Sequence, residues 1–444
     1  MNVTRRMAGI AIAAALSLFT MSGVPARAQD AGGGAAGQQK YTMAEYNAYQ
    51  AAAAEKDPKA QLKLLDDFMA KYPNSALLNY VYALYYKNYA GQKNFPKAIE
   101  YCDKLIALGD KASVTERYEA YSVRAYSFNN IPNPDPAAAK AAYESAQAGA
   151  KLVPTVPKPE GVDEAKFEEQ KKQSVLFFNG TAANAAMAAK DYASAIQAYK
   201  AVLAATPDDL TTNYSLGKAY NLMAPPQTLD ALWYYARAAS SKGANEAQAK
   251  QIKGYVRKLL ANYQGGTVCD ALTDAELNEL LQLAGTAAER PSTYQLYSAA
   301  DLEKARSNMT IASVVTDLKA GGDKAKLAWT AACDLEFPEV PGKIIEVIPG
   351  ADAVELKLAF VTSDEEFQAA TTPNMDVKVV GQQDAAKLEK DNPVHFTGHL
   401  VSYDPEPAFM LHWEKATVKD EDLPKAASPA KKPPVRKKPA GGKQ

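Results

Sequence analysis

The segment DYASAIQAYKAVL, residues 191–203, decides the fold of the first half of the chain. Ala195, Tyr199 and Val202 follow one another at intervals of four and three residues, so a small, a large and a medium side chain share one stripe of a helix. The same pattern recurs, less faithfully at the first site, at Ala98, at Ala139 with Tyr143, and at Ala231 with Tyr235. Recurrence of one helical stripe predicts repeated helical pairs between residues 41 and 266.

A second segment, NYSLGKAY at residues 213–220, supplies the partner helix of one pair. Gly217 permits a close helix crossing, and Leu216 and Tyr220 fill the space beside it. With the alanine column, this arrangement resembles the tetratricopeptide repeat, a helix–turn–helix unit that stacks into a solenoid. The resemblance places four units at residues 75–109, 115–151, 176–209 and 210–243. The alternative is an unrelated antiparallel helical bundle.

The spacing of the alanine column is uneven, and the widest gap contains VPTVPKPE at residues 153–160. Three prolines there predict an extended connector, followed by a separate charged helix over 163–173. Lysines and an arginine over 244–262 favour an amphipathic helix that caps the repeats. Residues 267–333 predict an additional helical segment with helices at 274–283, near Ser298 and at 323–332.

The chain changes character at residue 334, where apolar residues begin to alternate with polar ones. Five such runs, at 343–348, 354–361, 375–380, 394–403 and 409–418, predict a small antiparallel barrel over 334–420. The stretch FTGHLVSYDPEP at 396–407 with FML at 409–411 resembles the last hairpin of the OB-like domains that follow helical repeats in exported bacterial proteins. The fold class is therefore multidomain α + β, a helical tetratricopeptide-type solenoid followed by a five-stranded OB-like barrel.

Three late histidines are the only ones in the chain: His395, His399 and His412. A hairpin centred on 404–407 would place Gly398 opposite Trp413, and His399 opposite His412 on the outer face. A metal-dependent enzyme is then conceivable, but exposed cross-strand histidines are the simpler interpretation because no third ligand has a diagnostic spacing. The helical half has no histidine for nucleophilic catalysis. We therefore expect no enzymatic activity, no metal and no cofactor.

Three cysteines leave two interpretations open. Cys269 and Cys333 flank the additional helical segment and could form a disulfide in an oxidising compartment. The alternative is three separate buried thiols, with Cys102 in a core column of the repeats.

The resemblance to tetratricopeptide repeats also implies a concave groove that binds an extended peptide or a helix. By column, the groove-facing residues in the two best units are Phe177, Asn184, Met187, Thr211, Tyr214, Lys218 and Asn221. Gly180 stands where relatives that hold a peptide carboxylate have a lysine, which leaves that type of ligand in doubt.

The ends of the chain predict export and a second binding function. Residues 1–28 have a basic start, an apolar run and an Ala-x-Ala site, so a signal peptide should be cleaved between Ala28 and Gln29, before a flexible leader over 29–40. No later run could span a membrane. Residues 421–444 predict a disordered tail rich in lysine, proline and alanine.

The charge of −1 conceals a strong asymmetry along the 444 residues. Of the 50 basic residues, three lie in 1–28 and seven in 424–444, so residues 29–423 hold 40 basic residues against all 51 acidic ones, a net charge of −11. We expect a periplasmic or cell-envelope scaffold that binds a protein or peptide partner. An envelope anchor whose tail binds anionic polymer or lipid is the alternative, and nucleic acid is disfavoured.

Overall fold

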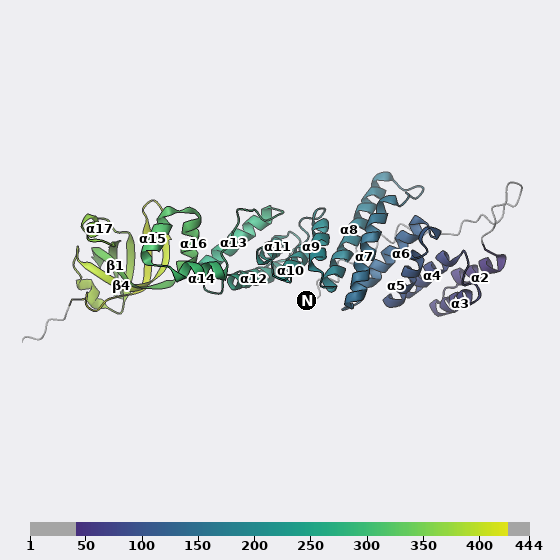
Figure 1. The fold of residues 1–444 in the computed structure, drawn as a ribbon, viewed down its shortest axis with the longest axis horizontal. Helices are drawn as coiled ribbons and strands as arrows, with labels where there is room; N and C mark the ends of the chain where they lie inside the picture. The colour runs from purple at the N-terminus through teal and green to yellow at the C-terminus, as the bar shows by residue number, and fades with distance from the viewer. Residues whose placement is uncertain (1–40, 425–444) are drawn as a thin grey trace, which may run out of the picture. The chain divides into compact units, whose positions relative to one another are not determined.

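The computed structural model describes residues 41–424 (Figure 1). The predicted signal peptide, its cleavage site at Ala28 and Gln29, the leader and nearly all of the basic tail lie outside the described residues. The chain divides into two compact units. One comprises the chain up to Val256 together with Glu279–Tyr294, and the other comprises Arg257–Asn278 together with the chain from Gln295 onward.

The first unit is built from helices that pack against their neighbours in sequence order (Figure 1). Short polar residues begin many of them; Asp191, for example, accepts a hydrogen bond from the Ser194 amide at the start of α9. The bounds are α2 Met43–Ala54, α3 Pro58–Lys71, α4 Leu78–Gly91, α5 Phe95–Ile106, α6 Val114–Asn129, α7 Pro136–Leu152, α8 Glu164–Ala188, α9 Tyr192–Leu203, α10 Leu210–Asn221, α11 Thr228–Ser240, α12 Glu246–Tyr263 and α13 Asp270–Thr286; α12 and α13 each extend into both units.

The alanine column that defines the repeat pattern is fully buried. Each of its four members is 0% exposed: Ala98, Ala139, Ala195 and Ala231. The larger residues predicted for the core are also buried, namely Tyr199, Leu216, Gly217, Tyr220 and Tyr235. Tyr143 is the exception, because it is half-buried and its hydroxyl accepts a hydrogen bond from the exposed side chain of Gln147. One buried small residue at the same place in each helix lets neighbouring helices approach closely.

Helix α8 differs from the sequence-based expectation of a separate charged helix over 163–173. It runs without interruption from Glu164 to Ala188, 25 residues, so the charged segment and the first helix of the next pair are one element. No glycine or proline interrupts the chain between residues 164 and 179. Ser174 at the midpoint is buried, and its hydroxyl lies 2.7 Å from the Tyr118 hydroxyl in α6. Packing of α8 against α6 therefore continues past residue 173, where the sequence predicted that the charged helix would end.

The second unit contains three helices directly before the barrel: α14 Ala299–Ser307, α15 Ile311–Ala320 and α16 Gly322–Ala332. Helix α15 was not predicted. It begins with a capping box in which Thr310 and Ser313 exchange side-chain and backbone hydrogen bonds, and it ends before Gly321, whose φ is +71°. Val314, Val315 and Leu318 of α15 belong to one buried apolar cluster with the barrel strands.

Five strands form a closed barrel in the order β1-β2-β3-β5-β4. Their bounds are β1 Leu335–Ile348, β2 Ala353–Phe360, β3 Met375–Val380, β4 Pro393–Asp404 and β5 Met410–Val418, with the short helix α17, Asp364–Ala369, between β2 and β3. The division into helical repeats and a five-stranded barrel is confirmed. One pair, β3 with β5, is parallel rather than antiparallel as predicted. Strand β4 is antiparallel to both β1 and β5, so β5 runs in the same direction as β1. Strand β3 also runs in the direction of β1, because β2 is antiparallel to both.

Strand β1 begins at Leu335 rather than at the predicted Lys343. Pro338 and Pro341 interrupt the alternating pattern that marked the strand. The pairing of β1 with β4 shifts between Phe337 and Val340, and Glu339 in this irregularity has a φ of +49°. An irregularity of this kind lets a strand continue through proline.

The predicted register of the last hairpin is wrong. Leu400 pairs with Trp413, and His399 pairs with Glu414 instead of His412. The register shifts between Thr397 and His399 and again between Leu400 and Ser402. A uniform alternation cannot reveal such irregularities, because each one changes which residues face each other.

Candidate functional site

On α10 and the C-terminal half of α8, a stripe of partly or fully exposed residues runs beside buried ones. The stripe consists of the seven residues that the repeat pattern assigned to the groove: Phe177, Asn184, Met187, Thr211, Tyr214, Lys218 and Asn221. None of the seven is buried, whereas Ala183, Ala185 and Leu216 between them are fully buried. Intervals of three, four and seven residues place the members of each helix on one face. We call these seven residues the stripe.

Tyr199 of α9 connects the two helices that carry the stripe. Its hydroxyl donates a hydrogen bond of 3.1 Å to Oδ1 of Asn184 in α8. Burial raises the pKa of Tyr199 to about 12, and a side-chain hydrogen bond with Ser215 of α10 acts in the opposite direction. The buried tyrosine therefore fixes Asn184 and α10 relative to each other.

Tyr235 occupies the equivalent place one repeat later. Its ring lies under two rings, meeting Tyr214 of α10 at 5.1 Å and Tyr255 of α12 at 5.0 Å between centroids, both edge to face. Burial raises the pKa of the Tyr235 hydroxyl above its ordinary value. Tyr214 and Tyr255 are each 39% exposed.

Sequence reasoning missed Tyr255. The basic residues of 244–262 drew attention to the polar face of that helix, which was interpreted as a cap. The available signal was Tyr255 itself, an aromatic residue among the basic residues of this segment, with Gln251 one helical turn before it. Only the packing of α12 against α11 shows that this ring adjoins the stripe.

Lys218 carries the only charge in the stripe. Its exposed ammonium has no carboxylate within 4 Å among the described residues, whereas Lys87 and Lys171 in the same unit have ion pairs of 2.8 and 3.0 Å. A lysine without an internal partner, on a face that has no acidic side chain, can pair with a ligand carboxylate.

Arg237 of α11 holds the loops at the end of the same repeat. It is 8% exposed, and its guanidinium donates to Oδ1 of Asn213 at 3.2 Å and to the backbone carbonyls of Pro207 at 2.9 Å, Ala284 at 3.2 Å and Ala287. Asp208 lies 3.7 Å away and supplies a counter-charge. All of its donors are directed inward, so Arg237 has a structural role.

The three histidines of the barrel are separated by the observed register. His412 lies between two carboxylates, with Nδ1 3.3 Å from Asp376 and Nε2 2.8 Å from Asp404. His399 contacts Asp334 and Glu336, and His395 contacts Asp422. Within residues 41–424 no group of three or more histidine, cysteine or acidic residues has the geometry of a metal site.

Two lysines on neighbouring strands of the barrel differ in their surroundings. Lys357 of β2 lies 2.6 Å from Glu355 and 2.8 Å from Asp376, so two carboxylates neutralise it. Lys378 of β3 is exposed. Acidic and basic side chains therefore alternate on this part of the barrel.

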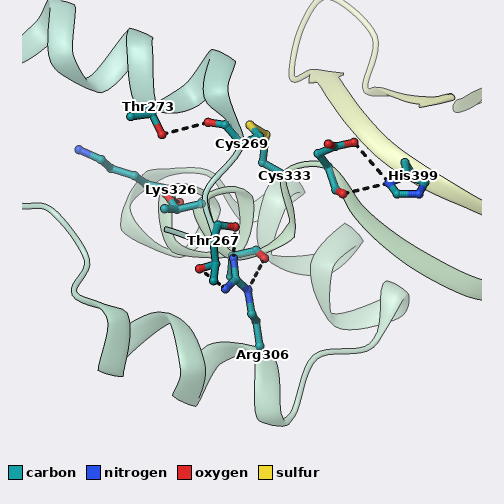
Figure 2. Close-up of a disulfide and its surroundings, with 10 residues drawn as sticks. Thr267, Cys269, Thr273, Arg306, Lys326, Cys333 and His399 are labelled. Atoms are coloured by element: carbon teal, nitrogen blue, oxygen red, sulfur yellow. Dashed lines mark hydrogen bonds and ion pairs between the residues drawn. A yellow bond between two sulfur atoms is a disulfide. The ribbon is translucent and has the colours of Figure 1, made fainter. Parts of the chain in front are cut away.

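Cys269 and Cys333 form a disulfide with a Cα–Cα distance of 5.7 Å, whereas Cys102 is a buried free thiol (Figure 2). Cys269 lies directly before α13, where its carbonyl accepts a hydrogen bond from Thr273, and Cys333 lies between α16 and β1. Nearby, Arg306 donates to the carbonyls of Thr267 and Ala331. His399, labelled in Figure 2, contacts Asp334, the residue that follows Cys333 in the sequence. The disulfide closes a loop that contains α13 to α16.

Comparison with known proteins adds no family assignment. No protein-family model matches the chain. No curated protein matches it either. Among residues 41–424, no helix is both long enough and apolar enough to cross a membrane.

Proposed function

We propose that this chain is an exported, non-enzymatic scaffold of the tetratricopeptide-repeat type that binds a protein or peptide partner in the cell envelope. The observation that carries the proposal is the stripe on α8 and α10. In α10 and in the C-terminal half of α8, most residues between the members of the stripe are buried, which leaves the stripe accessible to a ligand.

The chemistry of the stripe supports a peptide ligand. Asn184 and Asn221 offer amide groups, which can donate to and accept from an extended backbone. Phe177, Met187 and Tyr214 offer apolar contacts between them. The buried Tyr199 contacts Asn184 of the stripe, and the buried Tyr235 contacts Tyr214. These contacts preorganise the surface, so that binding requires little ordering of the protein.

The alternative is an envelope anchor that uses the basic tail on anionic polymer or lipid headgroups. The seven lysines and arginines of 424–444, set against the net charge of −11 over 29–423, favour it. A metal-dependent enzyme in the barrel loses its basis, because the pairing of His399 with His412 on which it rested does not occur.

A photoreactive benzoylphenylalanine introduced at Asn184 tests the proposal in the cells of origin. We expect one discrete crosslinked protein, identified by mass spectrometry. The matched control is the same substitution at Gln197, an exposed position on α9 outside the stripe. Identical products from both positions, or none from Asn184, would refute a binding role for the stripe.

Removal of residues 424–444, which hold all seven basic residues of the tail, separates the two candidate functions. A scaffold that binds through the stripe keeps the Asn184 crosslink after truncation. Loss of that crosslink together with loss of membrane or polymer association would favour the anchor.

A further inference from the structure

Two exposed tyrosines contact one buried tyrosine at the end of the stripe. Large apolar side chains with this much exposure are few among the described residues, and Tyr214 and Tyr255 are two of them. They come from different helices, α10 and α12, yet both rings meet the edge or face of the buried Tyr235 ring between them, at 5.1 and 5.0 Å. We call Tyr214, Tyr235 and Tyr255 the tyrosine platform.

The platform is rigid because its central residue is part of the core. Tyr235 is 2% exposed, and its own position is fixed by the close contact with Gly217, where an added Cβ would approach the ring to 3.0 Å. Rings held in this way lose little freedom when a ligand stacks on them, so an aromatic side chain can bind without a large entropic cost.

The stripe beside the platform contains one charged residue, Lys218, and it is positive. Lys218 lies one helical turn after Tyr214 on the same face of α10 and has no carboxylate within 4 Å among the described residues. Lys200 on the neighbouring helix, by contrast, lies 3.9 Å from Glu289. The stripe itself contains no acidic residue, although residues 29–423 as a whole are acidic. The local charge therefore complements a negatively charged ligand.

We propose that the tyrosine platform and Lys218 together bind an acidic peptide segment that carries an aromatic side chain. The aromatic ring would stack against Tyr214 and Tyr255, and a carboxylate of the peptide would pair with the Lys218 ammonium. This inference rests on the proposed peptide-binding function and adds the chemical class of the ligand. A peptide is favoured over a neutral glycan, because a lysine without a carboxylate partner can pair with a carboxylate of the peptide, whereas a neutral glycan offers it no charge.

Fluorescence anisotropy with three labelled nonapeptides tests the proposal on the full chain. The first repeats Glu-Glu-Phe three times, the second replaces every Glu with Lys, and the third replaces every Phe with Ala. We expect saturable binding of the first peptide and at least tenfold weaker binding of the other two. Equal binding of the lysine peptide would overturn the role of charge, and equal binding of the alanine peptide would overturn the role of the platform.

Variants locate the binding surface. Tyr214→Ala, Tyr255→Ala and Lys218→Glu should each weaken binding of the acidic peptide at least tenfold, whereas Lys140→Glu, at an exposed lysine of α7, should leave it unchanged. Circular dichroism melting curves check that each variant is folded, and Tyr214→Phe, which keeps the ring, should retain binding if the fold is intact. Acidic-peptide binding that none of the three substitutions weakens would overturn the proposal.

Two further results distinguish this inference from the proposed function. Tyrosine-dependent binding of a chitin oligosaccharide, without binding of any of the three peptides, would replace the peptide with a glycan. If the Asn184 crosslink forms in cells while the acidic peptide does not bind in vitro, the scaffold function stands and the acidic ligand class is wrong.

Discussion

Gly217 of α10 lies so close to Ala231 of α11 that a Cβ built on the glycine would reach the Ala231 carbonyl oxygen at 3.0 Å. The same Cβ would meet the Tyr235 ring at 3.0 Å. Neither a backbone carbonyl nor a buried ring can yield without moving α11. The contact therefore sets the distance between the two helices of the best-defined repeat.

Gly217→Ala should destabilise the helical unit by about 1–3 kcal/mol, because the added methyl group overpacks this contact. Chemical denaturation followed by circular dichroism measures the change. Gly180→Ala is the matched control, since no atom lies within 4 Å of its added Cβ. The control should be neutral or stabilising by up to about 1 kcal/mol, because alanine favours the helix more than glycine does. Equal effects of the two substitutions would show that the contact is not tight.

Arg237→Ala should cost about 3 kcal/mol or more, because it leaves the Ala284 carbonyl and Oδ1 of the buried Asn213 without the donor that Arg237 supplies. Arg237→Lys should recover only part of this loss, since an ammonium lacks the planar fork of donors. Thermal melting of both variants provides the measurement. A lysine variant as stable as the parent would mean that charge alone is sufficient.

Reduction of the Cys269–Cys333 disulfide should destabilise the second unit by about 4 kcal/mol if its effect is the loop entropy of the unfolded chain, given the sequence separation of 64. Denaturation followed by tryptophan fluorescence, with and without dithiothreitol, measures the loss, since Trp413 lies in the barrel core. The Cys102→Ala variant controls for the third cysteine and should respond to reductant as the parent does. No difference between oxidised and reduced protein would contradict the prediction.

Alkaline pH should weaken the helical unit through its buried tyrosines. Burial raises the pKa of Tyr199 to about 12 in the folded state, against about 10 when unfolded. The stabilisation is fully present below pH 10 and is lost as the pH rises through 12, because the unfolded chain ionises first. For Tyr199 alone this amounts to about 3 kcal/mol.

The Tyr199→Phe variant isolates this contribution. It should be less stable than the parent at pH 7, having lost the hydrogen bond to Asn184, but its stability should fall less between pH 10 and pH 12. Denaturant midpoints measured across that range provide the test. Parallel pH profiles for the two proteins would show that Tyr199 is not the titrating group.

Engineered cysteines can verify the corrected hairpin register. In a Cys102→Ala background, the pair His399→Cys and Glu414→Cys should form a disulfide, because these residues are directly opposite on β4 and β5. The pair His399→Cys and His412→Cys should not, since His412 faces Ser402. Mass spectrometry of alkylated peptides distinguishes the two outcomes, and the reverse pattern would restore the register predicted from the sequence.

Helical repeats could be predicted because their information is local. Ala195 with Tyr199, and Ala231 with Tyr235, recur at helical spacing within short segments, and a helix buries whatever lies on one face. The strands of the barrel were located for the same reason, since alternation of polar and apolar residues is also local. The stripe followed from the same columns, because burial of one helical face leaves the opposite one exposed.

Contacts between segments distant in the sequence were decided by tertiary structure. The alternation in β4 and β5 could not reveal the irregularities that separate His399 from His412, because register depends on which strand lies opposite. Likewise, the parallel pairing of β3 with β5 arises only when the barrel closes.

The platform shows the same division. The sequence by itself determined that Tyr214 lies on an exposed helical face and that Tyr235 is buried. Only tertiary packing placed Tyr255 from α12 beside them, because the position of a ring on one helix relative to a ring on another depends on how the helices cross. Spacing along one chain segment fixes a face, whereas a site made from two segments exists only after they pack.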